Sequence, residues 1–249
     1  MIGAVPWWNI GNPDDCIAAY QFKGVSNETT ALTDLTGHGY NLNKNFDPQW
    51  DSTQGYFLQN NKFLNATELH NVETIGTIVV RYAGLTKSET ELVQFTNIKA
   101  QGYYDFYHHF VFSARLKFSY LRANYSTSWE WVDMNRQGIV SKWILNPNNA
   151  YWNEMLVYNY ANVDLCKDYR SGVLASTRNQ LFLNGAKITT TEKRIQHVTQ
   201  MQNAGMGNQN NQTLSPSKTG HWVIAAAYYK PTITSEQTHK DLYDRMMAI

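Results

Sequence analysis

Residues 178–188 predict a β-hairpin, and this segment constrains the fold more tightly than any other in the chain. The segment reads Arg-Asn-Gln-Leu-Phe-Leu-Asn-Gly-Ala-Lys-Ile. Asn184 and Gly185 both accept positive φ angles, as the tight two-residue turn of a hairpin requires. Leu181 and Leu183 share one face of the strand, so a register slip of one residue would expose both. We therefore expect both leucines to face the core, with the Asn-Gly pair at the hairpin tip.

Short strands recur along most of the chain, with Gly, Asn and Pro between them. Aromatic and β-branched residues dominate these runs, as is typical of strands with a buried face. The predicted strands cover residues 56–58, 77–82, 92–96, 104–113, 116–121, 128–134, 155–158, 163–169, 180–183, 187–191 and 222–229. Many short strands with regular turn signals favour a sandwich or jelly roll over a parallel sheet with crossover helices.

The sequence shows a helix pattern of useful length at the C-terminus and none before it. Thr234 or Ser235 can serve as its N-cap, and Leu242 and Met246 lie near one helical face. The apolar face of this helix has to be buried, so we expect the helix to plug one end of a sandwich.

The first residues differ in character from the rest of the chain. Residues 1–15 contain Trp7, Trp8 and two prolines with little periodicity, so we interpret them as an arm ahead of one domain, residues 16–249. The tryptophans either pack on their own domain or dock on a neighbouring polypeptide. Proline cannot donate to a strand ladder, and an exposed Trp pair is costly in a monomer. We expect docking, in which case deletion of residues 1–14 leaves the domain folded.

Four segments, in chain order, resemble a known family. Residues 17–22 read as a strand ending in an aromatic residue, and residues 32–42 read Leu-Thr-Asp-Leu-Thr-Gly-His-Gly-Tyr-Asn-Leu. The hairpin 178–188 and the C-terminal segment 233–246 complete the set. Together they resemble concanavalin A-like, laminin-G-like lectin domains of bacteria and phages. The resemblance implies an all-β, concanavalin A-like jelly-roll β-sandwich of two antiparallel sheets with a short C-terminal helix.

Asp34 is the candidate metal ligand. In the resembling domains the aspartate of this turn helps to hold a structural calcium ion with backbone carbonyls, which suits a hard cation. The residues themselves also favour an Asx-turn, in which Asp34 caps its own loop ahead of Gly37. We prefer the Asx-turn and expect no other cofactor. Cys16 and Cys166 do not make a disulfide framework, and we expect buried free thiols, although their pairing stays open.

Aromatic residues are the candidate ligand-binding groups. Sugar rings present flat C–H faces that stack on Trp and Tyr. Trp129 and Trp131 would share one face of a strand, and with Tyr103 and Tyr104 they form the candidate platform. The same candidate cluster also includes Tyr107, Trp143, Tyr151 and Trp152. A place in the core is the competing interpretation for any one of these side chains.

The carboxylates do not match the pattern of a sandwich-fold glycoside hydrolase. Such an enzyme needs two carboxylates on the same side of its groove. Glu130 and Asp133 are three residues apart, so a strand places them on opposite faces. Glu89 and Glu91 share a face, but beside a lysine they read as a solvated surface. We therefore expect no catalysis, and the alternative is a polysaccharide hydrolase or lyase on the same fold.

Composition excludes several function classes. The formal net charge is +1, and the scattered Lys and Arg residues leave no electrostatic footprint for nucleic acid. The longest apolar run, residues 222–229, is too short to insert into a membrane. The N-terminus lacks the basic and apolar regions of a signal peptide. Residues 200–220 are rich in Gln, Asn, Gly and Ser, which predicts a long exposed loop or a flexible hairpin.

We therefore expect a non-enzymatic, lectin-like binding or adhesion module. The resemblance implies a glycan or cell-surface polysaccharide as its ligand. We expect a phage virion as its setting, as a capsid-decorating, head-fibre or tail-associated protein. Other virion proteins and further copies of this chain are then additional partners. Outside a virion, the protein would be cytoplasmic or exported without a recognisable signal peptide.

Overall fold

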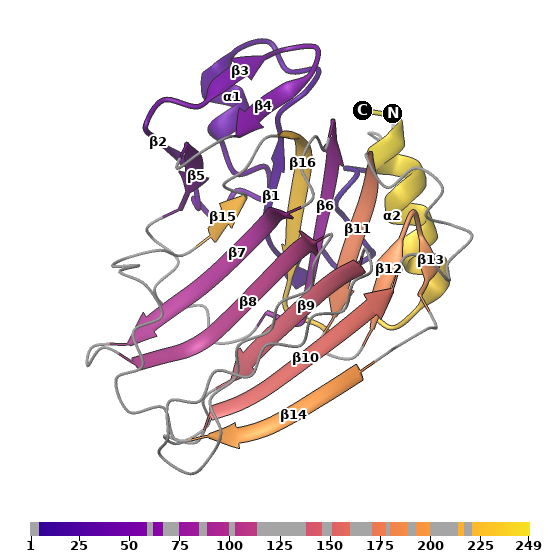
Figure 1. The fold of residues 1–249 in the computed structure, drawn as a ribbon. Coiled ribbons are helices and arrows are strands. Elements are labelled where there is room, and N and C mark those ends of the chain that lie inside the picture. Colours follow the sequence, from indigo (N-terminus) through magenta and orange to yellow (C-terminus); the bar gives the residue numbers. More distant parts are fainter. Residues whose placement is uncertain are drawn as a thin grey trace.

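The computed structural model describes twelve ranges of the chain. They are residues 5–58, 62–66, 75–84, 89–99, 103–113, 138–145, 151–159, 171–177, 180–188, 193–199, 214–216 and 221–249. These residues form mostly β-strands in antiparallel sheets, with a helix at the C-terminus (Figure 1). The prediction of an all-β chain with a short C-terminal helix is confirmed at this level.

The larger sheet has eight strands in the order β13-β12-β11-β6-β16-β4-β3, with β1 also paired to β16. Its strands are β1 (Cys16–Gln21), β3 (Gln49–Asp51), β4 (Gly55–Leu58), β6 (Thr77–Ala83), β11 (Gly172–Thr177), β12 (Leu181–Leu183), β13 (Ala186–Lys187) and β16 (His221–Tyr229). β11 is buried along its whole length, and β6 and β16 nearly so. Their near-continuous apolar runs are typical of strands covered on both faces.

The second sheet has six strands in the order β14-β10-β9-β8-β7-β15. Its strands are β7 (Glu89–Lys99), β8 (Tyr103–Ser113), β9 (Gly138–Leu145), β10 (Tyr151–Asn159), β14 (Lys193–Thr199) and β15 (Leu214–Pro216). A small sheet pairs β2 (Asn43–Asn45) with β5 (Phe63–Asn65). The helices are η1 (Pro13–Asp15), α1 (Glu28–Leu32) and α2 (Glu236–Met247). The predicted strands at 116–121, 128–134 and 163–169 lie outside the described residues.

The hairpin at the end of β12 forms as the sequence predicts. Leu183 pairs with Ala186 across the turn, and Asn184 and Gly185 have φ angles of 52° and 78°. Leu181 and Leu183 are both buried in the core. Gly185 has a second role, because a Cβ atom there would lie only 2.8 Å from the Cα atom of Lys240 in α2. The glycine therefore lets helix and hairpin pack closely.

Two apolar clusters cover opposite faces of the eight-stranded sheet, because successive residues of a strand point to opposite sides. The inner core includes Ile17, Tyr20, Phe22, Tyr56, Leu58, Ile78, Val80, Tyr82, Leu174, Leu181, Leu183, Val223 and Tyr228. The outer core consists of Trp8, Cys16, Ala19, Val79, Val173, Ala175, Phe182, Ala225, Ala227, Tyr229, Ile233, Leu242 and Met246. In Figure 1 the six-stranded sheet and α2 lie on opposite sides of the eight-stranded sheet.

Helix α2 covers the outer face of the sheet instead of plugging one end of it. Ser235 is the N-cap, and its hydroxyl oxygen accepts the backbone N–H of Thr238 at 3.2 Å. Leu242 and Met246 are buried, as the helical pattern predicts. They pack in the outer core with Phe182 and its neighbours. The prediction of the plugging position is wrong because the outer face of β11 and β12 is itself apolar and needs a cover.

The N-terminal arm packs on its own domain. Trp8 is only 8% exposed and belongs to the outer core. Its carbonyl oxygen accepts a hydrogen bond from the Tyr229 hydroxyl at 2.8 Å, and Arg245 donates to the carbonyl of Asn9 at 2.6 Å. The expectation that Trp8 needs another polypeptide to bury it is therefore wrong. Trp7 is half-buried against the same cluster, and docking of a partner on it stays a prediction.

Candidate functional site

Asp34 forms the buried centre of the loop after α1. Its carboxylate accepts the backbone N–H groups of Ala19 at 3.1 Å, Thr36 at 3.0 Å and Tyr40 at 3.2 Å. The Thr36 hydroxyl donates to the same carboxylate at 2.8 Å. The Asx-turn interpretation is thus confirmed, and the carboxylate ties the loop to β1. A structural calcium ion at Asp34 stays a prediction.

The other residues of this motif have structural roles of the same kind. The Asn41 side-chain oxygen accepts the backbone N–H of Asp34 at 2.9 Å. Gly37 and Gly39 have φ angles of 83° and 87°, which favour glycine. His38 Nδ1 lies 2.9 Å from the carbonyl oxygen of Ile17. Among the residues that the structure describes, no group of three or more His, Cys, Asp and Glu side chains could hold a metal ion.

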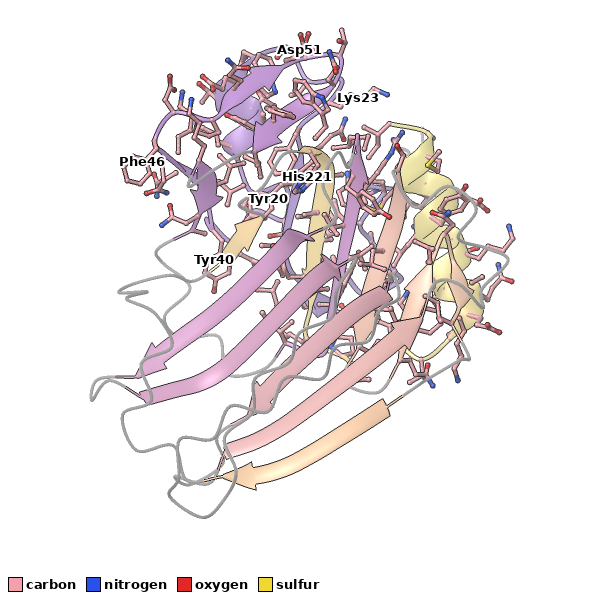
Figure 2. The ribbon with its side chains drawn as sticks, in the orientation of Figure 1. Tyr20, Lys23, Tyr40, Phe46, Asp51 and His221 are labelled. Carbon is pink, nitrogen blue, oxygen red and sulfur yellow. The ribbon has the colours of Figure 1, made fainter. Side chains whose placement is uncertain are left out.

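The loop between β2 and β3 exposes an aromatic side chain that sequence reasoning missed. Phe46 is 74% exposed, and Figure 2 shows it projecting from the small sheet at the edge of the molecule. Phe46 and Asp47 have φ angles of 55° and 50°, an uncommon conformation for residues other than glycine. Lys44 lies 3.1 Å from both Asp47 and Glu28 and holds the loop in place. The sequence did contain a signal for this exposed side chain, because Phe46 is an apolar residue within the polar segment 45–48, Asn-Phe-Asp-Pro.

The strand register brings four aromatic residues to one end of the six-stranded sheet. Tyr103 and Tyr104 begin β8, where Tyr103 pairs with Lys99 at the end of β7. Tyr151 and Trp152 begin β10. Leu145, the last residue of β9, pairs with Phe106 of β8 on one side and with Trp152 of β10 on the other. The start of β8 and the start of β10 therefore lie at the same end of the sheet. We call Tyr103, Tyr104, Tyr151 and Trp152 the aromatic end; it is the lower end of the sheet in Figure 1.

The remaining predicted site residues fall in two places. Trp129 and Trp131 lie outside the described residues, as do Glu130 and Asp133. Glu89 and Glu91 belong to β7, where Glu89 pairs with Ser113 at the far end of β8 from Tyr103. The register therefore separates these two glutamates from the aromatic end.

Cys16 is a free, fully buried thiol, as expected, whereas Cys166 lies outside the described residues. Burial and, to a lesser extent, the carboxylate of Asp34 raise the pKa of the Cys16 thiol. A thiol with a raised pKa is a poor nucleophile, because the reactive species is the thiolate. Cys16 is therefore part of the outer core rather than a reactive group.

His239 links α2 to the sheet through a buried ring. Its ring stacks on Phe182 with a centroid distance of 3.6 Å, and Nε2 lies 2.9 Å from the carbonyl oxygen of Ile233. Nε2 is the donor, since a carbonyl oxygen only accepts. Nδ1 is buried and has no hydrogen-bond partner among the residues that the structure describes. Burial lowers the pKa of His239, so the neutral ring is the form that fits.

Acidification is expected to destabilise the protein through this ring. A histidine whose pKa is lower in the folded state contributes stability above its unfolded pKa of about 6.5, and that stability is lost as the pH falls below this value. The melting temperature should therefore fall from pH 7 to pH 5 by more in the wild type than in His239→Gln, whose amide can still donate. His38→Gln, which keeps His239, is the control and should retain the wild-type fall. Equal slopes in the wild type and His239→Gln would contradict this role.

In the part of the chain that the structure describes, the helices are all too short or too polar to cross a membrane. Compared with known proteins, the chain matches no family model and no curated protein sequence.

Proposed function

We propose that this protein is a non-enzymatic, lectin-like module that binds a glycan at the aromatic end of its six-stranded sheet. The observation that carries the proposal is the register of β8, β9 and β10, which brings Tyr103 and Tyr104 together with Tyr151 and Trp152. On this proposal the two large sheets form a concanavalin A-like jelly-roll sandwich. The antiparallel pairing, the 178–188 hairpin and the Asp34 turn all support that fold.

The chemistry of this end of the sheet suits a sugar chain. Tyr and Trp combine a large apolar ring with one polar atom, so they can stack on a sugar and bond to a hydroxyl. Polar residues accompany them in the ladder. Asn153 follows Trp152 and pairs with His197 of β14, and Thr199 pairs with Tyr151. Amide, imidazole and hydroxyl groups supply both donors and acceptors for sugar hydroxyls.

Binding without turnover is the proposed mode of action. Retaining and inverting glycosidases both use two carboxylates that flank the scissile bond. The two glutamates that the sequence offers on one strand, Glu89 and Glu91, lie in β7 away from Tyr103. The polysaccharide hydrolase or lyase remains the alternative that the experiment has to exclude.

The proposed setting is a phage virion, in which the module attaches the particle to a cell-surface polysaccharide. The resemblance to bacterial and phage lectin-like domains supports this setting, as does the Asn- and Gln-rich tract 200–220. Other virion proteins and further copies of the chain are the proposed additional partners.

A glycan array followed by titration of the best ligand tests the proposal. Tyr104→Ala and Trp152→Ala should each weaken binding at least tenfold, about 1.4 kcal/mol, because each removes a stacking ring. Phe46→Ala is the matched control, since it removes an exposed aromatic side chain outside the aromatic end. Circular dichroism should show that all three variants stay folded.

Two results would contradict the proposed function. The first is unchanged glycan affinity in Tyr104→Ala and Trp152→Ala when both are folded. The second is the release of reducing ends or unsaturated products from β-glucans, galactans or uronic-acid polymers, if it disappears when a single Glu or Asp is replaced.

A further inference from the structure

A small pocket lies between the eight-stranded sheet and the last turns of α2, on the side of the sheet that carries the outer core. It has a volume of about 140 Å³. Its lining comes from the end of β6, the start of β11, the hairpin tip and α2. The residues that matter for its chemistry are Arg81, Ser171, Asn184, Tyr243 and Met247.

Arg81 is the buried charge of this pocket. Its side chain belongs to β6 and is only 9% exposed. One guanidinium nitrogen, Nη1, donates to the backbone carbonyl of Met246. Within the described residues Arg81 has no carboxylate partner, although a guanidinium carries five N–H donors. Burial lowers the pKa of Arg81, which is the opposite of the effect of an acidic neighbour.

Arg81 is thus a positive charge that lines the pocket without an acidic partner among the described residues, so an anion that enters the pocket can pair with it. The nearest helix does not supply such a partner. On α2, Asp244 pairs with Lys240 at 2.9 Å, and Asp241 accepts from Gln237 at 2.8 Å. Both carboxylates are thus engaged with side chains of their own helix, while Arg81 keeps donors to spare.

The other polar groups of the pocket can also donate. The Asn184 side-chain oxygen accepts the backbone N–H of Val173 at 2.9 Å, and its amide nitrogen is a further donor at the pocket. Tyr243 lies close enough to Arg81 to act on its charge, and its hydroxyl and that of Ser171 are donors. A guanidinium with amide and hydroxyl donors beside it is an arrangement suited to oxygen anions.

We propose that this pocket binds a small oxyanion, a phosphate or a carboxylate, with Arg81 as its charged anchor. The volume supports a small ligand, since a pocket of about 140 Å³ exceeds the space that one water molecule needs. The site is independent of the proposed glycan site, which belongs to the six-stranded sheet. Either proposal can therefore fail without the other.

The first test measures thermal unfolding of the full chain with millimolar inorganic phosphate, and in parallel with acetate, at constant ionic strength. A ligand that binds only the folded state raises the ratio of folded to unfolded protein about 100-fold at 100 times its dissociation constant. We expect a saturable rise in melting temperature. The anion with the larger rise identifies whether phosphate or carboxylate is preferred.

Two variants at one exposed position make the test specific. Met247 lines the pocket but is 46% exposed, so a polar side chain is tolerated there. Met247→Glu places a carboxylate beside Arg81 and should remove the phosphate response, with a higher melting temperature in the absence of added anion. Met247→Gln has the same shape without the charge and should keep the response. Arg81→Met should abolish the response if the variant folds.

Isothermal titration with inorganic phosphate gives a direct reading on the same proteins. Binding to the wild type and Met247→Gln, but not to Met247→Glu, is the expected result. Phosphate also stabilises proteins in general through its exclusion from their surfaces. An equal rise in melting temperature in the wild type and Met247→Glu would be that general effect, and it would overturn the proposal. The absence of any saturable response to phosphate and acetate in the wild type would overturn it too.

Discussion

Replacing Leu183 with aspartate is expected to prevent folding. Leu183 is 1% exposed in the inner core, where it faces neighbouring apolar side chains of the sheet. A carboxylate there would lose its hydration without gaining a partner, and an unpaired buried charge has one of the largest costs available to a single substitution. We expect the variant to be insoluble on expression, or to lack a cooperative unfolding transition.

Two variants separate the effect of charge from that of lost packing. Leu183→Ala should fold and lose about 2–5 kcal/mol of unfolding free energy, the usual cost of truncating a buried leucine. Phe46→Asp makes the same kind of apolar-to-acidic change at a side chain that is 74% exposed, and should cost less than about 0.5 kcal/mol. A folded Leu183→Asp protein with a melting temperature near that of the wild type would count against the hairpin's place in the core.

Replacing Trp8 with alanine is expected to lower the free energy of unfolding by about 3–5 kcal/mol, as measured by urea denaturation. The indole of Trp8 covers part of the outer core beside Tyr229, and its removal would leave a cavity there. Deletion of residues 1–14 should lower the free energy of unfolding by at least as much, because it also removes the carbonyl of Asn9 that accepts a hydrogen bond from Arg245. This outcome is the reverse of the expectation from the sequence, which was a folded domain after deletion.

Val5 provides the control within the same arm. Its side chain is 59% exposed, so Val5→Ala should leave the free energy of unfolding within about 0.5 kcal/mol of the wild type. If Trp8→Ala behaved like Val5→Ala, the arm would not be part of the core. Size-exclusion chromatography of both variants would then show whether Trp8 acts in assembly instead.

Local features of the structure were predictable because short-range physics decides them. The Asn184-Gly185 turn depends on positive φ angles that these two residue types accept. The N-cap at Ser235 depends on one hydroxyl and one backbone N–H three residues away. The Asx-turn at Asp34 likewise depends on neighbours in the chain. Each of these involves residues that are close in sequence, so the pattern contains all the interacting groups.

The candidate sites were only partly predictable. The sequence places Tyr103, Tyr104, Tyr151 and Trp152 in one cluster of candidate aromatic residues, but their common position at one end of the sheet depends on the register of three strands. Arg81 was not singled out at all. It stands in an apolar run, and only the packing of α2 shows that a charge is buried there among the residues that the structure describes.

The sequence by itself determined the Asn184-Gly185 turn between its two strands and the C-terminal helix, since turn chemistry and capping depend on neighbouring residues. The tertiary structure alone decided what covers each face of the eight-stranded sheet. β6, β11 and β16 are buried on both faces and consist mostly of apolar residues, so each face of the sheet needs a cover, but the strand sequences do not show which segment supplies it. Trp8 and α2 cover the outer face. The hydrophobic effect is non-directional, so any apolar segment that can reach this face could cover it, and the strand sequences do not select one.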